Sequence, residues 1–210
     1  MMWYAVLVLA VGAERVAELV VARRNARWSL ARGAVESGRR HYPVMVALHT
    51  GLLAGCLGEV WALGQPFHPV LGWSMLAVTA AAQGLRWWCV FTLGPRWNTR
   101  VLVLPGLRLV CAGPYRWLRH PNYVAVVAEG LALPLVHGAW LTATLFTVGN
   151  AALLTVRVRC EERALGRTGA ARTPEPVAGR AARAPAAGPP AKDGSRTAAG
   201  PAAGTGGGPR

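Results

Sequence analysis

Five long apolar runs, separated by shorter polar segments, determine most of what this chain can fold into. Most of them hold about 20 residues, the length that an α-helix needs to cross the hydrocarbon core of a membrane. The fourth run is shorter and is interrupted by Glu129-Gly130 and Pro134. The sequence therefore predicts an all-α integral membrane protein with about five transmembrane helices, at residues 2–21, 42–63, 70–91, 122–136 and 139–158.

The distribution of charge predicts the topology. The net charge of +14 is almost wholly arginine, because Lys192 is the only lysine. A balance this basic is typical of proteins that bind nucleic acid or an anionic membrane surface, and the apolar runs favour the membrane over nucleic acid. Arginines gather in 23–41, 96–119 and after residue 156, while the turns near Gly64 and His137 hold none. The positive-inside rule then places the N-terminus outside and those basic segments in the cytoplasm.

Composition also divides the chain. Residues 1–167 are predicted to form one membrane domain. Residues 168–210 are mainly Ala, Gly, Pro and Arg, cannot bury a core and are expected to be disordered. The preference for Arg over Lys suggests a GC-rich bacterial genome, so we expect the protein in a bacterial plasma membrane.

Two polar clusters fall on the predicted cytoplasmic side. One is the stretch Gly113–Tyr123, and the other is the run Arg157–Glu162, where Arg157 and Glu161 share a helix face. Polar groups beside a membrane indicate function. The alternative is interfacial anchoring, with Glu161 paired to Arg157. Just before the first cluster, two short apolar runs flank Pro105-Gly106. The runs are Val101–Leu104 and Leu107–Val110, and they predict a small hairpin or paired extended segments.

Other ionisable residues lie within the apolar runs. Glu14 and Glu18 share a helix face. They are either a carboxylate pair at the membrane boundary, neutralised by Arg15 or Arg24, or the polar wall of a substrate pocket. His41 and His49 are interpreted as satisfied polar residues, because their spacing is not that of ligands on one helix face. The four cysteines lack metal-site spacing and are interpreted as buried apolar residues, so no metal site is predicted. Phosphate-binding, serine hydrolase, zinc protease and dinucleotide-binding motifs are missing from the sequence.

The two clusters together carry a family resemblance. Gly113-x-Tyr115-x-x-x-Arg119-His120-Pro121-x-Tyr123, followed by Arg157-x-x-x-Glu161-Glu162-x-x-Leu165, resembles the isoprenylcysteine carboxyl methyltransferase family. The N-terminal half resembles a bacterial branch that O-methylates alkylresorcinols and alkylpyrones and is often found beside type III polyketide synthases. The residues that suggest this branch are Glu14-Arg15-x-x-Glu18-Leu19, Arg24-Asn25, Gly33-Ala34-x-Glu36 and His41-Tyr42-Pro43.

The resemblance implies an S-adenosylmethionine site on the cytoplasmic side. The positions that match the cofactor-binding segments are Leu107, Arg108, Leu109, Val110, Tyr115, His120, Pro121, Asn122, Tyr123 and Glu161. Arg157, Glu162 and Arg119 are expected to take part in catalysis, and Arg157, Glu14 and Glu18 to face the substrate. The expected partners are the lipid bilayer, a lipophilic acceptor and, for a polyketide lipid, a type III polyketide synthase pathway.

The acceptor determines what the site must do. A carboxylate is already ionised at neutral pH and needs only an orienting group such as Arg157. A phenol has a pKa of about 10 and needs a general base or a stabilised phenolate. Glu14, Glu18, His41 and Glu162 are the candidates for that base. Besides a lipidic phenol or pyrone, the alternatives are a prenylated cysteine carboxylate and a phospholipid amine.

The C-terminus departs from the family's pattern. Family members continue after the paired glutamates with spaced aromatic residues, whereas no aromatic residue follows Phe146 in this chain. Part of the cover over the cofactor is therefore missing, which motivates a further alternative, a catalytically silent membrane scaffold of the same fold.

Overall fold

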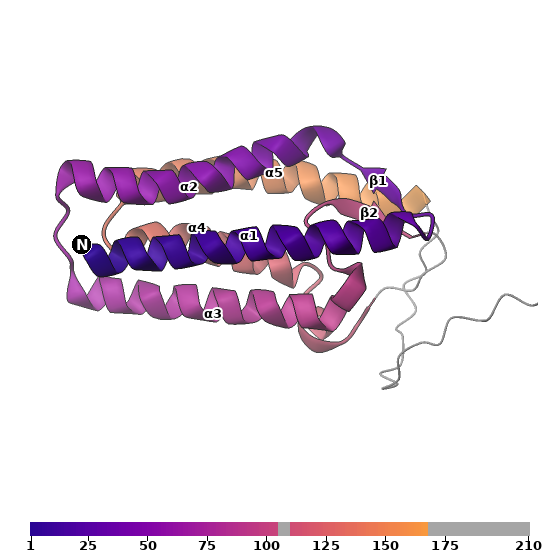
Figure 1. Cartoon of the computed structure of the whole chain (residues 1–210), viewed down its shortest axis with the longest axis horizontal. Helices are drawn as coiled ribbons and strands as arrows, with labels where there is room; N and C mark the ends of the chain where they lie inside the picture. The colour runs from indigo at the N-terminus through magenta and orange to yellow at the C-terminus, as the bar shows by residue number, and fades with distance from the viewer. Residues whose placement is uncertain (105–109, 168–210) are drawn as a thin grey trace, which may run out of the picture. The chain divides into compact units, whose positions relative to one another are not determined.

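The chain forms a bundle of five long α-helices. The computed structural model describes residues 1–104 and 110–167, so the predicted disorder of 168–210 lies outside the described residues. The helices lie side by side, with the short strands and 3-10 turns gathered at the end away from the N-terminus (Figure 1). In chain order the elements are α1 (Met2–Leu30), β1 (Val35–Ser37), η1 (Arg39–His41), α2 (Tyr42–Leu63), α3 (Pro69–Leu93), η2 (Gly94–Arg96), β2 (Val101–Val103), η3 (Gly113–Arg116), α4 (Pro121–Leu135) and α5 (Trp140–Arg167).

Prolines and a glycine determine several helix boundaries. Pro43, Pro69 and Pro121 lie in the first turn of their helices, where a missing N–H costs nothing. Gly64 ends α2 with a φ of 57°, a left-handed conformation that side chains with a Cβ avoid. The predicted starts of the helices therefore agree closely with the structure. Two helices run past the predicted spans: α1 continues from residue 21 to Leu30 and α5 from residue 158 to Arg167.

The strand β2 has a partner that was not predicted, and the pairing predicted around Pro105-Gly106 falls largely outside the described residues. β2 pairs antiparallel with β1, and Val35 lies opposite Val103. The pairing buries Val101 and Val103, and Glu36 on β1 forms ion pairs with Arg39 and Arg100. β2 therefore pairs with the segment after α1, more than 60 residues upstream. Of the predicted partner segment, Leu107–Val110, only Val110 is described, and it is not in a strand. The β1–β2 pair is called the ribbon below.

The surface of the bundle remains strongly apolar. Among the described helices, α2 and residues Trp140–Ala164 of α5 are long and apolar enough to cross a membrane, and only 17% of the apolar window of α2 is buried inside the bundle. Large exposed apolar side chains also occur on the other helices, for example Val6, Leu9, Phe91, Val127 and Leu131. Two helices are thus candidate membrane spans, while five transmembrane spans remain a prediction, since α1 carries internal charges and α4 has only 15 residues.

The start of α5 is capped from a neighbouring helix. Glu59 of α2 accepts hydrogen bonds from the backbone N–H groups of Leu141 and Thr142 at 3.0 and 2.7 Å, and from the Thr142 hydroxyl at 2.8 Å. A carboxylate at a helix N-terminus satisfies orphan N–H groups and interacts favourably with the helix dipole.

Replacing Glu59 with alanine is therefore expected to lower the free energy of unfolding by about 1–2 kcal/mol. The thermal unfolding midpoint of detergent-solubilised protein measures this. Thr144→Ala is the control, because that exposed hydroxyl bonds only to the Trp140 carbonyl in its own helix. Equal midpoints for the two variants would contradict the capping role.

Candidate active site

Two adjoining cavities lie at and below the ribbon end of the bundle. The first, about 410 Å³, is bounded by β2, the residues around η3 and the ends of α4 and α5. We call it the ribbon-side cavity. The second, about 130 Å³, lies among all five helices and is called the interhelical cavity. Both cavities are lined by Trp97, Asn122, Tyr123 and Arg157, so these residues form a common wall.

The ribbon-side cavity gathers most of the predicted site. The predicted residues that line it are Val110, Tyr115, Arg119, His120, Asn122, Tyr123, Arg157, Glu161 and Glu162. Pro121 is fully buried and starts α4 instead of lining the cavity. Leu107, Arg108 and Leu109 lie outside the described residues. Two clusters almost 40 residues apart in sequence are thus brought to one cavity by the packing of α4 on α5.

Glu161 connects the two sequence clusters. Its carboxylate accepts a 2.7 Å hydrogen bond from the Tyr123 hydroxyl, and its Oε2 lies 3.8 Å from His120 Nδ1. The rings of His120 and Tyr123 stack with centroids 5.3 Å apart. The result is a partly exposed carboxylate beside aromatic faces, a set of groups that suits a ligand carrying positive charge.

Tyr115 is held in place by a tight turn. Gly113 has a φ of 54°, and a Cβ at this position would lie 3.0 Å from Trp88 Nε1, so glycine is required two residues before Tyr115. Burial, and then the neighbouring Cys89 thiol, raise the pKa of Tyr115 above its usual value. Tyr115 therefore stays a neutral phenol and contributes an aromatic surface to the cavity.

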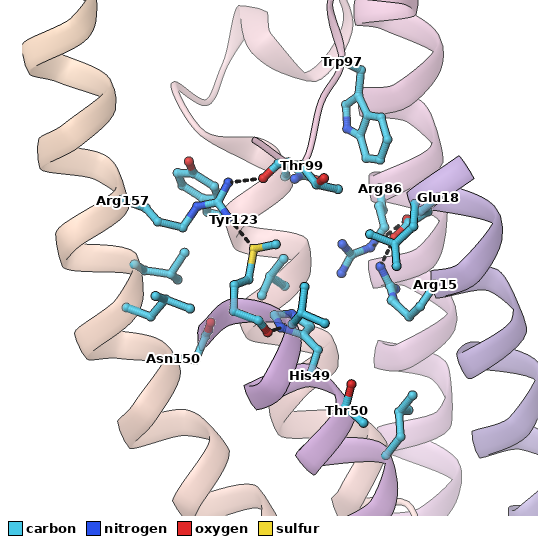
Figure 2. A pocket seen from close by; sticks show the side chains of 18 residues that line it. Arg15, Glu18, His49, Thr50, Arg86, Trp97, Thr99, Tyr123, Asn150 and Arg157 are labelled. Carbon is cyan, nitrogen blue, oxygen red and sulfur yellow. Dashed lines mark hydrogen bonds and ion pairs between the residues drawn. The ribbon is translucent and has the colours of Figure 1, made fainter. Parts of the chain in front are cut away.

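Arg157 occupies the wall between the cavities. Its guanidinium donates a 2.9 Å hydrogen bond to the Thr99 carbonyl, contacts the Met45 sulfur and lies 5.6 Å from the centre of the Tyr123 ring (Figure 2). Arg157 turns toward α2 and the segment before β2, and the ion pairs of the described residues do not include the pair with Glu161 that the anchoring interpretation expected. Its Nε has no hydrogen-bond partner among residues 1–104 and 110–167.

Arg119 and Glu162 lie at the exposed rim of the ribbon-side cavity. Their side chains are 66% and 49% exposed and form a 3.9 Å ion pair. An exposed pair of this kind stabilises a fold by only about 0–1 kcal/mol. Neither residue lines the interhelical cavity, and their catalytic roles remain predictions.

A buried charge cluster forms the opposite wall of the interhelical cavity. Glu129 Oε2 accepts 2.6 Å hydrogen bonds from both Arg15 and Arg86. Glu18 pairs with the same two arginines, with Oε1 3.5 Å from Arg86 Nε. Arg15, Glu18 and Arg86 line the cavity, as Figure 2 shows. Glu129 and Arg86 were not predicted as site residues, although a charge inside an apolar run is itself a signal of function.

The other candidate bases lie elsewhere. The Glu14 carboxylate accepts hydrogen bonds from Gln83 and Trp87 and lies outside the cavity lining, so of the two predicted substrate carboxylates only Glu18 reaches it. His41 lines neither cavity. Partial burial and the Arg157 guanidinium lower the pKa of His41.

Polar atoms without hydrogen bonds gather around the interhelical cavity. The described residues contain eight buried side-chain nitrogens or oxygens of this kind, and seven belong to residues that line this cavity: Arg15 Nε, Glu18 Oε1, Arg86 Nε, Trp97 Nε1, Asn122 Oδ1, Asn150 Oδ1 and Arg157 Nε. Two of the seven, Glu18 Oε1 and Arg86 Nε, form the 3.5 Å ion pair with each other, which leaves five with neither a hydrogen bond nor an ion pair. A buried polar group without a partner costs about 1–3 kcal/mol. Their concentration at one largely apolar cavity indicates a ligand with polar groups on an apolar body.

Comparison with known proteins identifies related sequences. The family model described as "Isoprenylcysteine carboxyl methyltransferase (ICMT) family" matches residues 75–167, which include α4, α5 and the described walls of the ribbon-side cavity from Tyr115 to Glu162. A Bacillus subtilis (strain 168) protein, "Uncharacterized protein YpbQ", is 41% identical over 166 residues, covering 79% of this chain and 96% of the relative. A Haemophilus influenzae "Uncharacterized protein" is 23% identical over 150 residues, covering 70% of this chain and 86% of the relative.

Proposed function

Because this chain belongs to the isoprenylcysteine carboxyl methyltransferase (ICMT) family, a family of methyltransferases, we propose that it is an S-adenosylmethionine-dependent enzyme that O-methylates a lipidic acceptor. The observation that carries the proposal is the common wall of the two cavities. A donor in one cavity and an acceptor in the other would meet at Tyr123 and Arg157. Methyl transfer is an in-line displacement, so holding two reactants on either side of one wall supplies much of the rate.

The ribbon-side cavity fits S-adenosylmethionine in size and chemistry. About 410 Å³ is room for a nucleoside with an amino-acid side arm, and the wall offers a carboxylate, Glu161, with the aromatic rings of Tyr115, His120 and Tyr123. Glu161 would hold the ammonium, and the rings would lie against the adenine and the sulfonium. When bound, the cofactor supplies an electrophilic methyl group. The role of the chain is to orient that group toward the common wall and to exclude water.

The interhelical cavity fits the head of an alkylresorcinol or alkylpyrone. A cavity of about 150 Å³ accommodates benzene, so about 130 Å³ is near the size of one small ring, and a long chain would extend elsewhere. The unpaired polar atoms around the cavity suit a ring that carries oxygen substituents. A type III polyketide synthase would supply such an acceptor. A prenylated carboxylate or a phospholipid amine, by contrast, carries a single reacting group on an open chain.

We further propose a multi-pass arrangement in a bacterial plasma membrane. The ribbon end of the bundle carries the arginine-rich segments and would face the cytoplasm, where the cofactor is made. The exposed apolar residues of all five helices would face lipid, and the acceptor would enter sideways between helices. The convergence of Tyr115, Tyr123 and Glu161 at one cavity supports an enzyme over a silent scaffold, even though aromatic residues are missing after Phe146.

Calorimetry with S-adenosylhomocysteine tests the cofactor site. Glu161→Gln is expected to weaken binding about 10- to 100-fold, because a charge-assisted hydrogen bond contributes about 1.5–3 kcal/mol. Glu161→Asp keeps the charge and should recover part of the affinity, which separates loss of charge from loss of packing. Absence of binding by the unaltered protein, or equal affinities in all three proteins, would rule out this site.

A further inference from the structure

His49 stands in the interhelical cavity next to the common wall. It lies on α2 one helical turn after Met45, the residue that contacts Arg157, and its side chain lines the cavity (Figure 2). One turn rises about 5.4 Å, so the ring lies one turn deeper than the Arg157 guanidinium along α2. The edge of Phe146 packs against the ring, with centroids 5.3 Å apart and planes at 87°, and holds its orientation.

The hydrogen bond at one ring nitrogen determines the state of the other. His49 Nδ1 lies 2.8 Å from the Met45 carbonyl oxygen. A carbonyl only accepts hydrogen bonds, so Nδ1 carries the proton. In the neutral ring Nε2 then holds a lone pair, and no hydrogen bond to it is found among the described residues. The His49 side chain lines the interhelical cavity, so this lone pair is available to a ligand there.

The remaining bases are engaged or distant. Glu18 is the one carboxylate among the described residues that line the interhelical cavity, and Arg15 and Arg86 both pair with it. Glu14 and His41 do not line the cavity, and Glu162 lines only the ribbon-side cavity. Both oxygens of Glu18 are engaged by guanidiniums, so His49 is the group with a lone pair available.

We propose that His49 is the general base for the acceptor, which is therefore a hydroxyl compound, a phenol or an enol. This rests on the proposed methyltransferase function. The acceptor O–H bond breaks and its proton passes to Nε2. The oxygen electron pair forms the new C–O bond with the methyl carbon, while the C–S bond breaks with its electrons retained by sulfur, so the sulfonium becomes a neutral thioether. The imidazolium then returns its proton to water. Arg15, Arg86 and Arg157, on the same cavity, stabilise the negative charge that develops on oxygen.

Methyl transfer to a 5-alkylresorcinol, followed from pH 6 to 10, tests the role. His49→Gln is expected to lower kcat about 100-fold at pH 7. The deficit should shrink toward pH 10, because the phenol, with a pKa of about 10, then ionises without help. His68→Gln, an exposed histidine before α3, should keep the kcat and pH profile of the unaltered protein. An unchanged profile in His49→Gln, or transfer only to a farnesylcysteine carboxylate, overturns the proposal while leaving the methyltransferase function intact.

A second measurement does not depend on turnover. Nitrogen NMR of protein labelled in its histidines should show one ring protonated at Nδ1 with a bare Nε2 at neutral pH. Its signal should disappear in His49→Gln, persist in His68→Gln, and shift when the alkylresorcinol is added. An Nε2-protonated ring or an imidazolium at position 49 overturns the assignment of the base, even if no methyl transfer is observed.

Discussion

Replacing Glu129 with alanine is expected to lower the free energy of unfolding by about 3–5 kcal/mol. Glu129 is 4% exposed and bridges the guanidiniums of Arg15 and Arg86 through one oxygen. Without it, two buried cations share Glu18 alone within the interhelical wall. The one uncompensated positive charge that remains in an apolar bundle is costly, because its desolvation penalty is no longer offset. The thermal midpoint in detergent measures the loss.

A paired variant separates charge imbalance from lost packing. Arg86→Met together with Glu129→Leu removes one ion of each sign and leaves Arg15 paired with Glu18. We expect this double variant to be clearly more stable than Glu129→Ala, because replacing a buried ion pair by apolar residues of similar volume is often neutral. If the double variant were as unstable as the sum of its single substitutions, the cluster would not act as a charge-balanced unit.

Replacing Arg157 with glutamine should lower kcat about 10²- to 10³-fold with little effect on S-adenosylhomocysteine binding. The guanidinium lies in the common wall, and its Nε is aimed at neither Thr99 nor Met45, which other nitrogens contact. Loss of one preorganised donor at a reacting oxygen typically costs this much. Initial rates with a saturating acceptor, together with calorimetry on the same preparation, check the prediction.

Arg159→Gln is the matched control for Arg157. It removes an arginine from the same helix two residues away, where the side chain is exposed and lines neither cavity. Its kcat should stay within a factor of two of the unaltered protein. A loss of kcat in both variants, or a loss of cofactor binding in Arg157→Gln, would contradict the prediction that Arg157 orients the acceptor.

The helices and most residues of the ribbon-side cavity were accessible from the sequence. Apolar run length, proline at helix starts and the glycine after α2 act through near neighbours, so all five helix starts were predicted within one residue. The motifs around Tyr115, His120 and Tyr123 and around Glu161 were likewise assigned to one site, and the structure brings them to one cavity. α1 and α5 continue past the predicted spans, because each helix extends beyond its apolar run into charged residues.

The interhelical cavity was mostly missed. Glu18 was predicted to face a substrate pocket and does line the interhelical cavity, but Glu14 does not, although the two share a helix face by spacing. The two carboxylates differ because Gln83 and Trp87 on α3 donate hydrogen bonds to Glu14. His49 was interpreted as satisfied, since spacing reveals neither which ring nitrogen is used nor whether the other faces a cavity.

The sequence by itself determined that this chain is helical, strongly apolar and basic at one end, and which residues carry the family's cofactor motif. Those properties follow from short-range periodicity and composition. The tertiary structure decided which charges balance, which strand pairs with β2 and which polar atoms share the interhelical cavity. Arg15 and Glu129 are 114 residues apart and meet through a 2.6 Å hydrogen bond. Such a contact depends on the rotation and packing of helices distant in the chain, which local sequence patterns do not encode.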